Sequence, residues 1–330
     1  MKKLFLHVGP HKTGTTLIQK FMLDNQSKLL SSELFYPKRF IRIFGHHEFR
    51  DRLEDMNLSS NDVDFLNEYA GDVLLSSEDF ISLNDRHLDY LRAKFSDTKI
   101  VVIYAWRRAS SKLYSIWQES IKHGGVDTFF EYHHNHLASP AQSMMLSADL
   151  KLKMFCRIFG KQNVKVLDYN ASAKNDTLIT DFLTILGREP NEKYVFPENN
   201  PQAQNRSMAH TDTEIIRVLN YMFRERKKIT GTAVRELYTE NYARLDQESL
   251  GQLKILIQKD TVNLDAGKYF IDQRSEKVIT NVYTDNILNY EQPKSEVRIT
   301  VAKQNWLLEE HVSKFLDKLY ASLDELIVNV

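Results

Sequence analysis

The first half of the chain alternates short apolar runs with longer segments in which apolar residues recur every three or four positions. The short runs predict buried strands. They cover Leu4–Val8, Asp72–Ser76, Lys99–Tyr104 and Val164–Leu167. The longer segments predict helices at Thr15–Leu30, Asp85–Phe95, Ser110–Lys122 and Ala148–Phe159. Because alternating strands and helices are typical of a parallel sheet with crossover connections, we predict an α/β fold, a parallel sheet flanked by helices.

After about residue 175 the strand pattern disappears and the helical pattern continues. Helices are expected at Asp176–Leu186, Thr211–Arg226, Leu245–Gln258 and about Glu276–Leu288. A last set of apolar residues shares one helical face and consists of Trp306, Leu307, Val312, Phe315, Leu316, Leu319 and Leu323. We predict an α/β domain over residues 1–290 and, over 291–330, an amphipathic helical extension packed on that domain. A helix that pairs two copies into a homodimer is the alternative.

The charge balance limits the classes of partner. The 330 residues include 44 Lys and Arg against 44 Asp and Glu, so no global field favours nucleic acid, and an anion site has to be local. The single cysteine, Cys156, excludes an intramolecular disulfide and fits a cytoplasmic protein. No run approaches the ~18 apolar residues of a membrane span, so we expect a protein that does not span a membrane.

The segment Gly9–Thr16, with the sequence GPHKTGTT, has the form of an anion-binding loop. It follows the first predicted strand and opens the first predicted helix, so backbone N–H groups and the helix dipole converge on one point. Its glycine spacing matches the start of the Walker A loop, G-x-x-x-x-G-K-[ST], but Thr15 stands at the lysine position. The lysine is Lys12, inside the loop.

A second cationic element follows the strand at Lys99–Tyr104, where Arg107 and Arg108 lie at the expected carboxyl edge of the sheet. Open α/β sheets bind ligands at this edge, and arginine can hold a phosphate through two parallel N–H bonds. Ser115 lies eight residues beyond Arg107 on a predicted helix. Taken alone, two arginines at the end of a strand form a structural ion-pair site at least as often as a ligand-binding site.

The segment Pro10–Thr16 resembles the 5'-phosphosulfate-binding loop of sulfotransferases that use 3'-phosphoadenosine 5'-phosphosulfate (PAPS), which typically reads Pro-Lys-[Ser/Thr]-Gly-Thr-Thr after the first strand. The extra His11 departs from the cytosolic small-molecule branch and looks more like the bacterial and carbohydrate-directed branches. The resemblance implies a P-loop NTPase-like sulfotransferase fold, PAPS as co-substrate, 3'-phosphoadenosine 5'-phosphate (PAP) as product, and no metal. The loop residues that it implies for cofactor binding are His11, Lys12, Thr13, Gly14, Thr15 and Thr16.

The same resemblance implies further roles. Lys12 contacts the leaving phosphate, and Arg107 with Ser115 holds the 3'-phosphate; Arg108 is the alternative to Arg107. The segment Asn205-Arg206-Ser207 resembles an element that closes over the cofactor in bacterial members, which makes Arg206 a candidate, although a plain helix N-cap explains these residues as well.

Sulfuryl transfer also needs a base for the incoming hydroxyl. Glu78 is the first choice, because it follows the strand Asp72–Ser76 and resembles the Ser-Ser-Glu of bacterial members. His47 and its neighbour His46 are the competing candidates. Glu78, together with aromatic and histidine side chains expected on loops, favours a carbohydrate or glycolipid acceptor. Those loop residues are Tyr36, Trp117, Tyr132 and His134, and His133 and His136 are expected on the same loop as His134.

Two other functions remain open from the sequence. A P-loop kinase or NTPase that uses ATP and Mg²⁺ agrees with the loop spacing but lacks the lysine at position 15. The second function is that of a nucleotide-binding module without turnover, which acts as an interaction protein through its C-terminal helix.

Overall fold

The computed structural model describes residues 2–140, 142–143, 146–191, 193–197, 208–265, 270–288, 290 and 298–328. The chain forms two compact units, and each is described by itself. The first consists of residues 1–109, 140–200 and 270–294, and the second of residues 110–139, 201–269 and 295–330. These units group the chain differently from residues 1–290 and 291–330, and the domain boundary at 290 stays a prediction.

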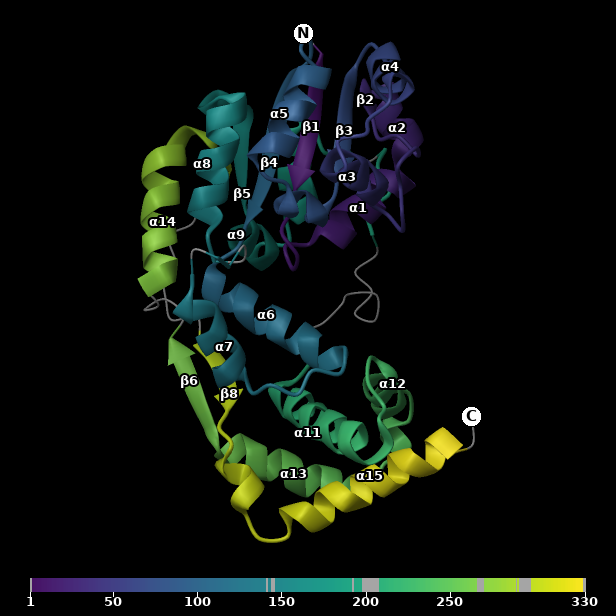
Figure 1. Cartoon of the computed structure of the whole chain (residues 1–330), viewed down its shortest axis with the longest axis vertical. Coiled ribbons are helices and arrows are strands. Elements are labelled where there is room, and N and C mark those ends of the chain that lie inside the picture. Colours follow the sequence, from purple (N-terminus) through teal and green to yellow (C-terminus); the bar gives the residue numbers. More distant parts are fainter. Residues whose placement is uncertain are drawn as a thin grey trace. The chain divides into compact units, whose positions relative to one another are not determined.

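The first unit contains the predicted parallel sheet (Figure 1). In the described residues the sheet has six strands in the order β2-β3-β1-β4-β5-β7, and every neighbouring pair is parallel. The strands are β1 Lys3–Val8, β2 Leu34–Phe35, β3 Asp72–Ser76, β4 Lys99–Trp106, β5 Val164–Asp168 and β7 Ile287–Leu288. The predicted α/β fold with helices flanking a parallel sheet is confirmed.

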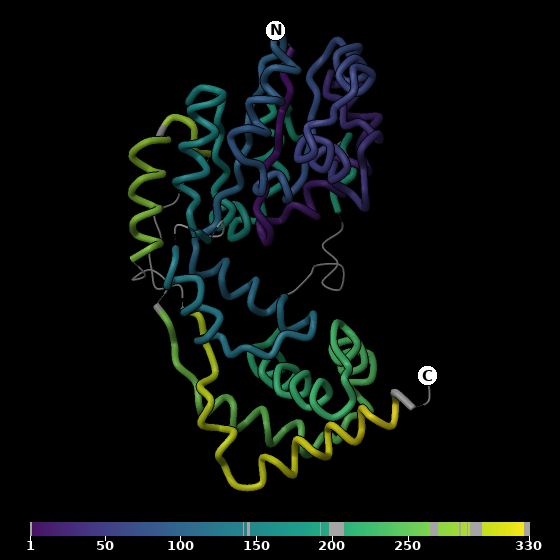
Figure 2. Tube along the Cα trace, viewed as in Figure 1, coloured from purple at the N-terminus to yellow at the C-terminus, as the bar shows by residue number. Residues whose placement is uncertain are grey.

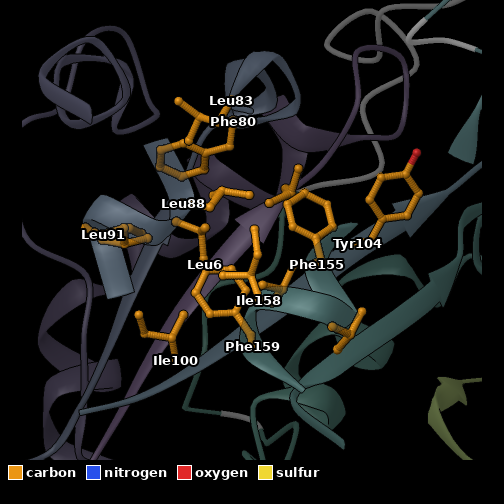
Figure 3. Packing of buried hydrophobic residues seen from close by; sticks show 14 of the residues in the cluster. Leu6, Phe80, Leu83, Leu88, Leu91, Ile100, Tyr104, Phe155, Ile158 and Phe159 are labelled. Carbon is orange, nitrogen blue, oxygen red and sulfur yellow. The ribbon is translucent and has the colours of Figure 1, made fainter. Parts of the chain in front are cut away.

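Helices cover both faces of this sheet because alternate residues of each strand point to opposite sides. On one face, Leu4, Leu6 and Val8 of β1 pack in a cluster that Figure 3 shows around Phe155, and α3, α5, α8 and α14 contribute to it. On the other face, Phe5 packs with residues of α1, α2 and α10. The helices of this unit are α1 Thr15–Asp24, α2 Gln26–Ser31, α3 His47–Glu54, α4 Ser60–Glu68, α5 Asp85–Lys94, α8 Ala148–Phe159, α9 Tyr169–Lys174, α10 Leu178–Ile185 and α14 Phe270–Tyr283, with 3-10 turns η1 Glu78–Ser82, η2 Lys161–Asn163 and η5 Thr284–Asn286.

The strand order creates a switch point beside β1. The chain leaves β1 toward β2 and β3 on one side and reaches β4 and β5 on the other. In open parallel sheets, the carboxyl ends of strands at such a point form the usual ligand-binding edge. The segments after β1, β3 and β4 therefore meet where the sequence places the anion-binding loop, Glu78 and Arg107.

The second unit is mostly helical and has its own core, which includes Trp117, Phe223, Trp306 and Leu319. Its helices are α6 Ala109–Lys122, α7 Phe129–Ala138, α11 His210–Lys227, α12 Ala233–Glu240, α13 Gln247–Lys259 and α15 Val312–Val328, with 3-10 turns η3 Tyr242–Arg244 and η6 Asn305–Leu308. Strands β6 Thr261–Asp265 and β8 Arg298–Ala302 pair antiparallel. In Figure 2, the yellow trace of α15 runs beside the green trace of α13.

The structure corrects three details of the sequence prediction. The strand pattern does not end at residue 175, because β6, β7 and β8 follow it; each is five residues or shorter and carries little periodicity. The helix expected over Glu276–Leu288 begins earlier and ends at Tyr283. Trp306 and Leu307 lie on η6 rather than on the last helix, because His311, with a backbone φ of 69°, interrupts the helical path before Val312.

Candidate functional site

The loop between β1 and α1 is built as an anion cradle. Lys12 and Gly14 have backbone φ angles of 66° and 74°, in the left-handed region that non-glycine residues rarely adopt. The hydroxyl of Thr13, which is fully buried, donates to the Pro10 carbonyl over 2.6 Å and holds the turn closed. Thr13 therefore shapes the loop, and the left-handed backbone at Lys12 is strain of the kind found at binding sites.

The N-terminus of α1 faces this loop without a side-chain cap in the described residues. No acidic residue stands in its first turn. The first N–H groups of a helix have no partner within the helix, and the helix dipole adds positive charge there, so such an end attracts an anion. Thr16, on that first turn, is exposed.

Thr15, at the position where the Walker A loop has its lysine, is buried in the loop. Its side chain is 5% exposed, and a Cβ added at Gly9 would lie 2.2 Å from the Thr15 methyl carbon. Gly9 is thus required by the close packing of Thr15. The lysine of this loop is Lys12, which is half-buried.

Arg107 follows β4 and reaches the anion cradle. Its Nη1 donates to the Lys12 carbonyl over 2.6 Å, and its guanidinium lies 5.1 Å from the centre of the Tyr169 ring. Burial lowers the pKa of the Arg107 guanidinium, but arginine remains charged at any relevant pH. One cation at the end of β4 is therefore fixed beside the loop that follows β1.

Arg108 has a structural environment instead. Its Nη2 donates to Glu276 of α14 over 3.0 Å, its Nη1 lies 3.9 Å from the buried Asp168, and its guanidinium packs over the Trp106 ring. Its backbone N–H donates to the Asn170 side chain. These contacts connect β4, β5 and α14, and they favour Arg107 over Arg108 as the ligand-binding arginine.

Replacing Arg108 by alanine is expected to lower the free energy of unfolding by about 2 kcal/mol, since Asp168 and Glu276 would lose their shared cation. Urea unfolding of the purified variant measures the change. PAP affinity should stay within about threefold of wild type. A stable variant that binds PAP much more weakly would assign the ligand contact to Arg108.

Ser115 and Arg206 are the other residues predicted to bind the cofactor. Ser115 lies on α6 in the second unit. Arg206 lies outside the described residues, as does the whole Asn205-Arg206-Ser207 segment. The roles of both residues stay predictions.

Glu78 lies at the start of η1, after β3, with its side chain 18% exposed. Its Oε2 accepts a hydrogen bond from Gln19 Nε2 over 2.9 Å, and the same amide lies 3.3 Å from Ser76 Oγ. Ser76 in turn contacts His7 Nδ1 at 2.8 Å. A chain of polar side chains from β1, α1 and β3 therefore holds Glu78 at the carboxyl edge of the sheet.

His46 is a structural residue. Its Nδ1 accepts from the backbone N–H of Ser76 over 3.0 Å, so its Nε2 carries the hydrogen that reaches the Pro37 carbonyl over 2.9 Å. Both ring nitrogens are used and the side chain is fully buried. Burial lowers the pKa of His46 to about 4 and that of His7 to about 3. His46 is therefore held as a neutral imidazole with no free nitrogen for an acceptor proton.

These two buried histidines predict a pH dependence of stability. Both stay neutral in the folded chain, while in the unfolded chain each takes up a proton near its ordinary pKa of 6.5. The contribution of the two histidines to the free energy of unfolding is therefore fully present above about pH 6.5. It falls as the pH is lowered toward 4, by up to about 1.4 kcal/mol per pH unit for each histidine. Urea unfolding across this range should show a shallower slope for His7→Asn than for wild type, and an unchanged slope for the exposed control His123→Gln. Equal slopes for all three proteins would contradict the assignment.

His47 differs from His46 because one ring nitrogen faces the site. Its Nδ1 lies 2.8 Å from Asp79 Oδ2 and 3.0 Å from Ser77 Oγ, and its Nε2 lies 3.9 Å from Glu78 Oε2. The structure thus brings together the two base candidates, Glu78 and His47. His11 of the loop joins the group, with Nε2 3.3 Å from Asp79 Oδ1.

Of the aromatic and histidine residues expected on loops to favour a sugar, all but Tyr36 lie on helices. His133, His134, Tyr132 and His136 lie on α7, which begins at a Thr128 capping box that the sequence analysis did not recognise. Trp117 lies on α6, and its side chain is 1% exposed, as is that of Tyr36. Trp117 and Tyr36 are core residues, so these side chains give no support for a carbohydrate acceptor.

The sequence pattern did not indicate four further residues of the site, which are Gln19, Ser76, Asp79 and Tyr169. Gln19 follows the loop by one helical turn and Asp79 follows Glu78 directly, so their proximity to the predicted residues is a signal that could have found them. Tyr169 comes from the end of a strand distant in sequence, and no local pattern connects it to Arg107.

The described residues contain no group of three or more His, Cys, Asp and Glu side chains arranged to hold a metal. In that part of the chain, no helix combines the length and apolar character needed to cross a membrane.

No family model and no curated protein matches this sequence. Among solved structures, the chain is similar to a sulfotransferase from Alicyclobacillus acidocaldarius, with 14% sequence identity and a TM-score of 0.37. The similarity covers 70% of this chain and 98% of the other.

Proposed function

We propose that this protein transfers the sulfuryl group of PAPS to an acceptor hydroxyl. The observation that carries the proposal is the link between the two cationic elements: Arg107, after β4, donates to the backbone carbonyl of Lys12 in the loop after β1. PAPS carries anionic groups at both ends of its ribose, and two joined cationic elements at a strand switch point suit such a donor.

The composition of the loop supports PAPS over ATP. Thr15 occupies the Walker lysine position and is packed against Gly9. Lys12 is the cation that the loop offers, and the uncapped N-terminus of α1 offers N–H groups for the 5'-phosphate. The negative charges of the donor would be neutralised by Lys12, the loop N–H groups and Arg107, so the reaction needs no metal.

The residues of this chain would divide the work as follows. The acceptor oxygen forms a bond to sulfur while the bond from sulfur to the 5'-phosphate oxygen breaks. Lys12 stabilises the charge that develops on that leaving oxygen, and the acceptor proton passes to Glu78 or His47. Gln19 keeps Glu78 in place through the hydrogen bond to Oε2. PAP then leaves the loop and Arg107.

A carbohydrate or glycolipid is the acceptor class that we propose, because Glu78 resembles the glutamate of bacterial and carbohydrate-directed enzymes. We also place the activity in the cytoplasm, in line with the single cysteine.

Transfer of label tests this function directly. The protein is incubated with [³⁵S]PAPS and a defined mixture of mono- and disaccharides, with phenol as a separate acceptor. Label on a sugar, together with release of PAP, is expected. The proposal would be overturned if PAPS stays intact with every acceptor and the protein also fails to bind PAP.

A further inference from the structure

One carboxylate, Asp79, connects the anion-binding loop with a base candidate. Asp79 is the second residue of η1, and its backbone N–H donates to Ser77 Oγ over 3.2 Å, which fixes the start of this turn. Its Oδ2 lies 2.8 Å from His47 Nδ1, and its Oδ1 lies 3.3 Å from His11 Nε2. Each oxygen therefore serves a different imidazole.

The contact with Asp79 determines which nitrogen of His47 carries a hydrogen. An ionised carboxylate can only accept a hydrogen bond, so the hydrogen of the neutral imidazole is on Nδ1. The lone pair is then on Nε2, which faces Glu78 Oε2 at 3.9 Å. A neutral histidine held in this tautomer is ready to accept a proton at Nε2.

The hydrogen bond between His47 and Asp79 is not a surface contact, because His47 is buried. The side chain of His47 is 11% exposed, whereas that of His11 is 59% exposed. The charged and titratable groups around His47 are Asp79, Glu78, the neighbouring His46, and Arg50, whose Nη2 lies 3.8 Å from Asp79 Oδ2. Of these, Asp79 alone bonds to the ring of His47.

We propose that Asp79 is a positioning residue: it holds His47 as the Nδ1–H tautomer, so that Nε2 accepts the proton of the acceptor hydroxyl, and it joins this base to the donor loop through His11. This inference rests on the proposed function and assigns the base to His47, with Glu78 beside it orienting the hydroxyl. The proton leaves the acceptor oxygen as that oxygen bonds to sulfur, and it ends on His47 Nε2.

The tautomer is tested by ¹⁵N NMR of protein labelled in its eleven histidines, with the His47 signal assigned by its loss in His47→Gln. Wild type should show Nδ1 protonated and Nε2 unprotonated. In Asp79→Ala, His47 should shift toward the Nε2–H form that free imidazole side chains prefer. The control Asp51→Ala removes a carboxylate that also pairs with Arg50, at 3.0 Å, and should leave the spectrum of His47 unchanged. An unchanged tautomer in Asp79→Ala would overturn the inference.

Kinetics with PAPS and the saccharide mixture provide the second readout. Asp79→Ala should lower kcat by about 10- to 100-fold, with PAP affinity within about threefold of wild type, because Lys12 and Arg107 are untouched. Asp79→Asn keeps an acceptor oxygen for Nδ1–H and should recover part of the rate, which a merely unstable variant would not do. A full rate in Asp79→Ala would contradict the positioning role. Failure of the wild-type protein to bind PAP would instead overturn the proposed function. The NMR measurement would still determine the tautomer of His47, because that result does not depend on PAP binding.

Discussion

Replacing Lys12 by alanine is expected to lower the rate of sulfuryl transfer by about 10²- to 10³-fold, the usual loss when one preorganised group that stabilises developing charge is removed. The reason is that Lys12 lies within the loop that the donor phosphate would occupy, while position 15 holds a buried threonine. The measurement is the release of PAP from PAPS in the presence of the saccharide mixture, under saturating PAPS.

The matched control is Lys20→Ala, which removes an exposed lysine from α1, the helix that begins after the loop. It should transfer at the wild-type rate. Circular dichroism of Lys12→Ala should match wild type, since Lys12 is not one of the buried residues that form the core of the sheet. A Lys12→Ala protein that transfers at nearly the wild-type rate would remove Lys12 from the mechanism.

Replacing Arg107 by alanine is expected to weaken PAP binding by roughly 10- to 150-fold, which corresponds to the loss of hydrogen bonds to a charged group. ADP lacks the 3'-phosphate, so its affinity should fall less. The ratio of PAP to ADP affinity therefore separates a lost phosphate contact from a distorted loop, because Arg107 also bonds to the Lys12 carbonyl. Isothermal titration calorimetry measures both ligands.

Arg92→Ala is the control for this comparison, since Arg92 is an exposed arginine of α5 with a side chain that is 56% exposed. It should leave both affinities unchanged. An Arg107→Ala protein in which PAP and ADP lose affinity equally would limit Arg107 to shaping the loop.

The central strands and the loop could be predicted from sequence because their signals are local. β1, β3, β4 and β5 are buried on both faces and give continuous apolar runs, and Gly9 and Gly14 mark the turn between strand and helix. Strand ends also identify the sheet edge, so Glu78 and Arg107 could be expected at one side of the sheet.

The rest of the site depends on contacts between distant segments. No pattern in the sequence indicates that Arg108 pairs with Glu276, which lies 168 residues away, and this contact is what separates its environment from that of Arg107. Likewise, His46 and His47 are neighbours with opposite roles: one has both ring nitrogens bonded to the backbone, and the other faces Glu78 and Asp79. The histidines of α7 were placed on a loop because the Thr128 capping box that begins the helix was not recognised.

The most direct test of the proposed function is calorimetric titration of the wild-type protein with PAP, with ADP, and with ATP in the presence of Mg²⁺. PAP is expected to bind most tightly, with an advantage over ADP that comes from the 3'-phosphate and an affinity that Mg²⁺ does not change. Tighter binding of ATP with Mg²⁺ than of PAP would contradict the proposed function and would make this site that of a kinase or NTPase.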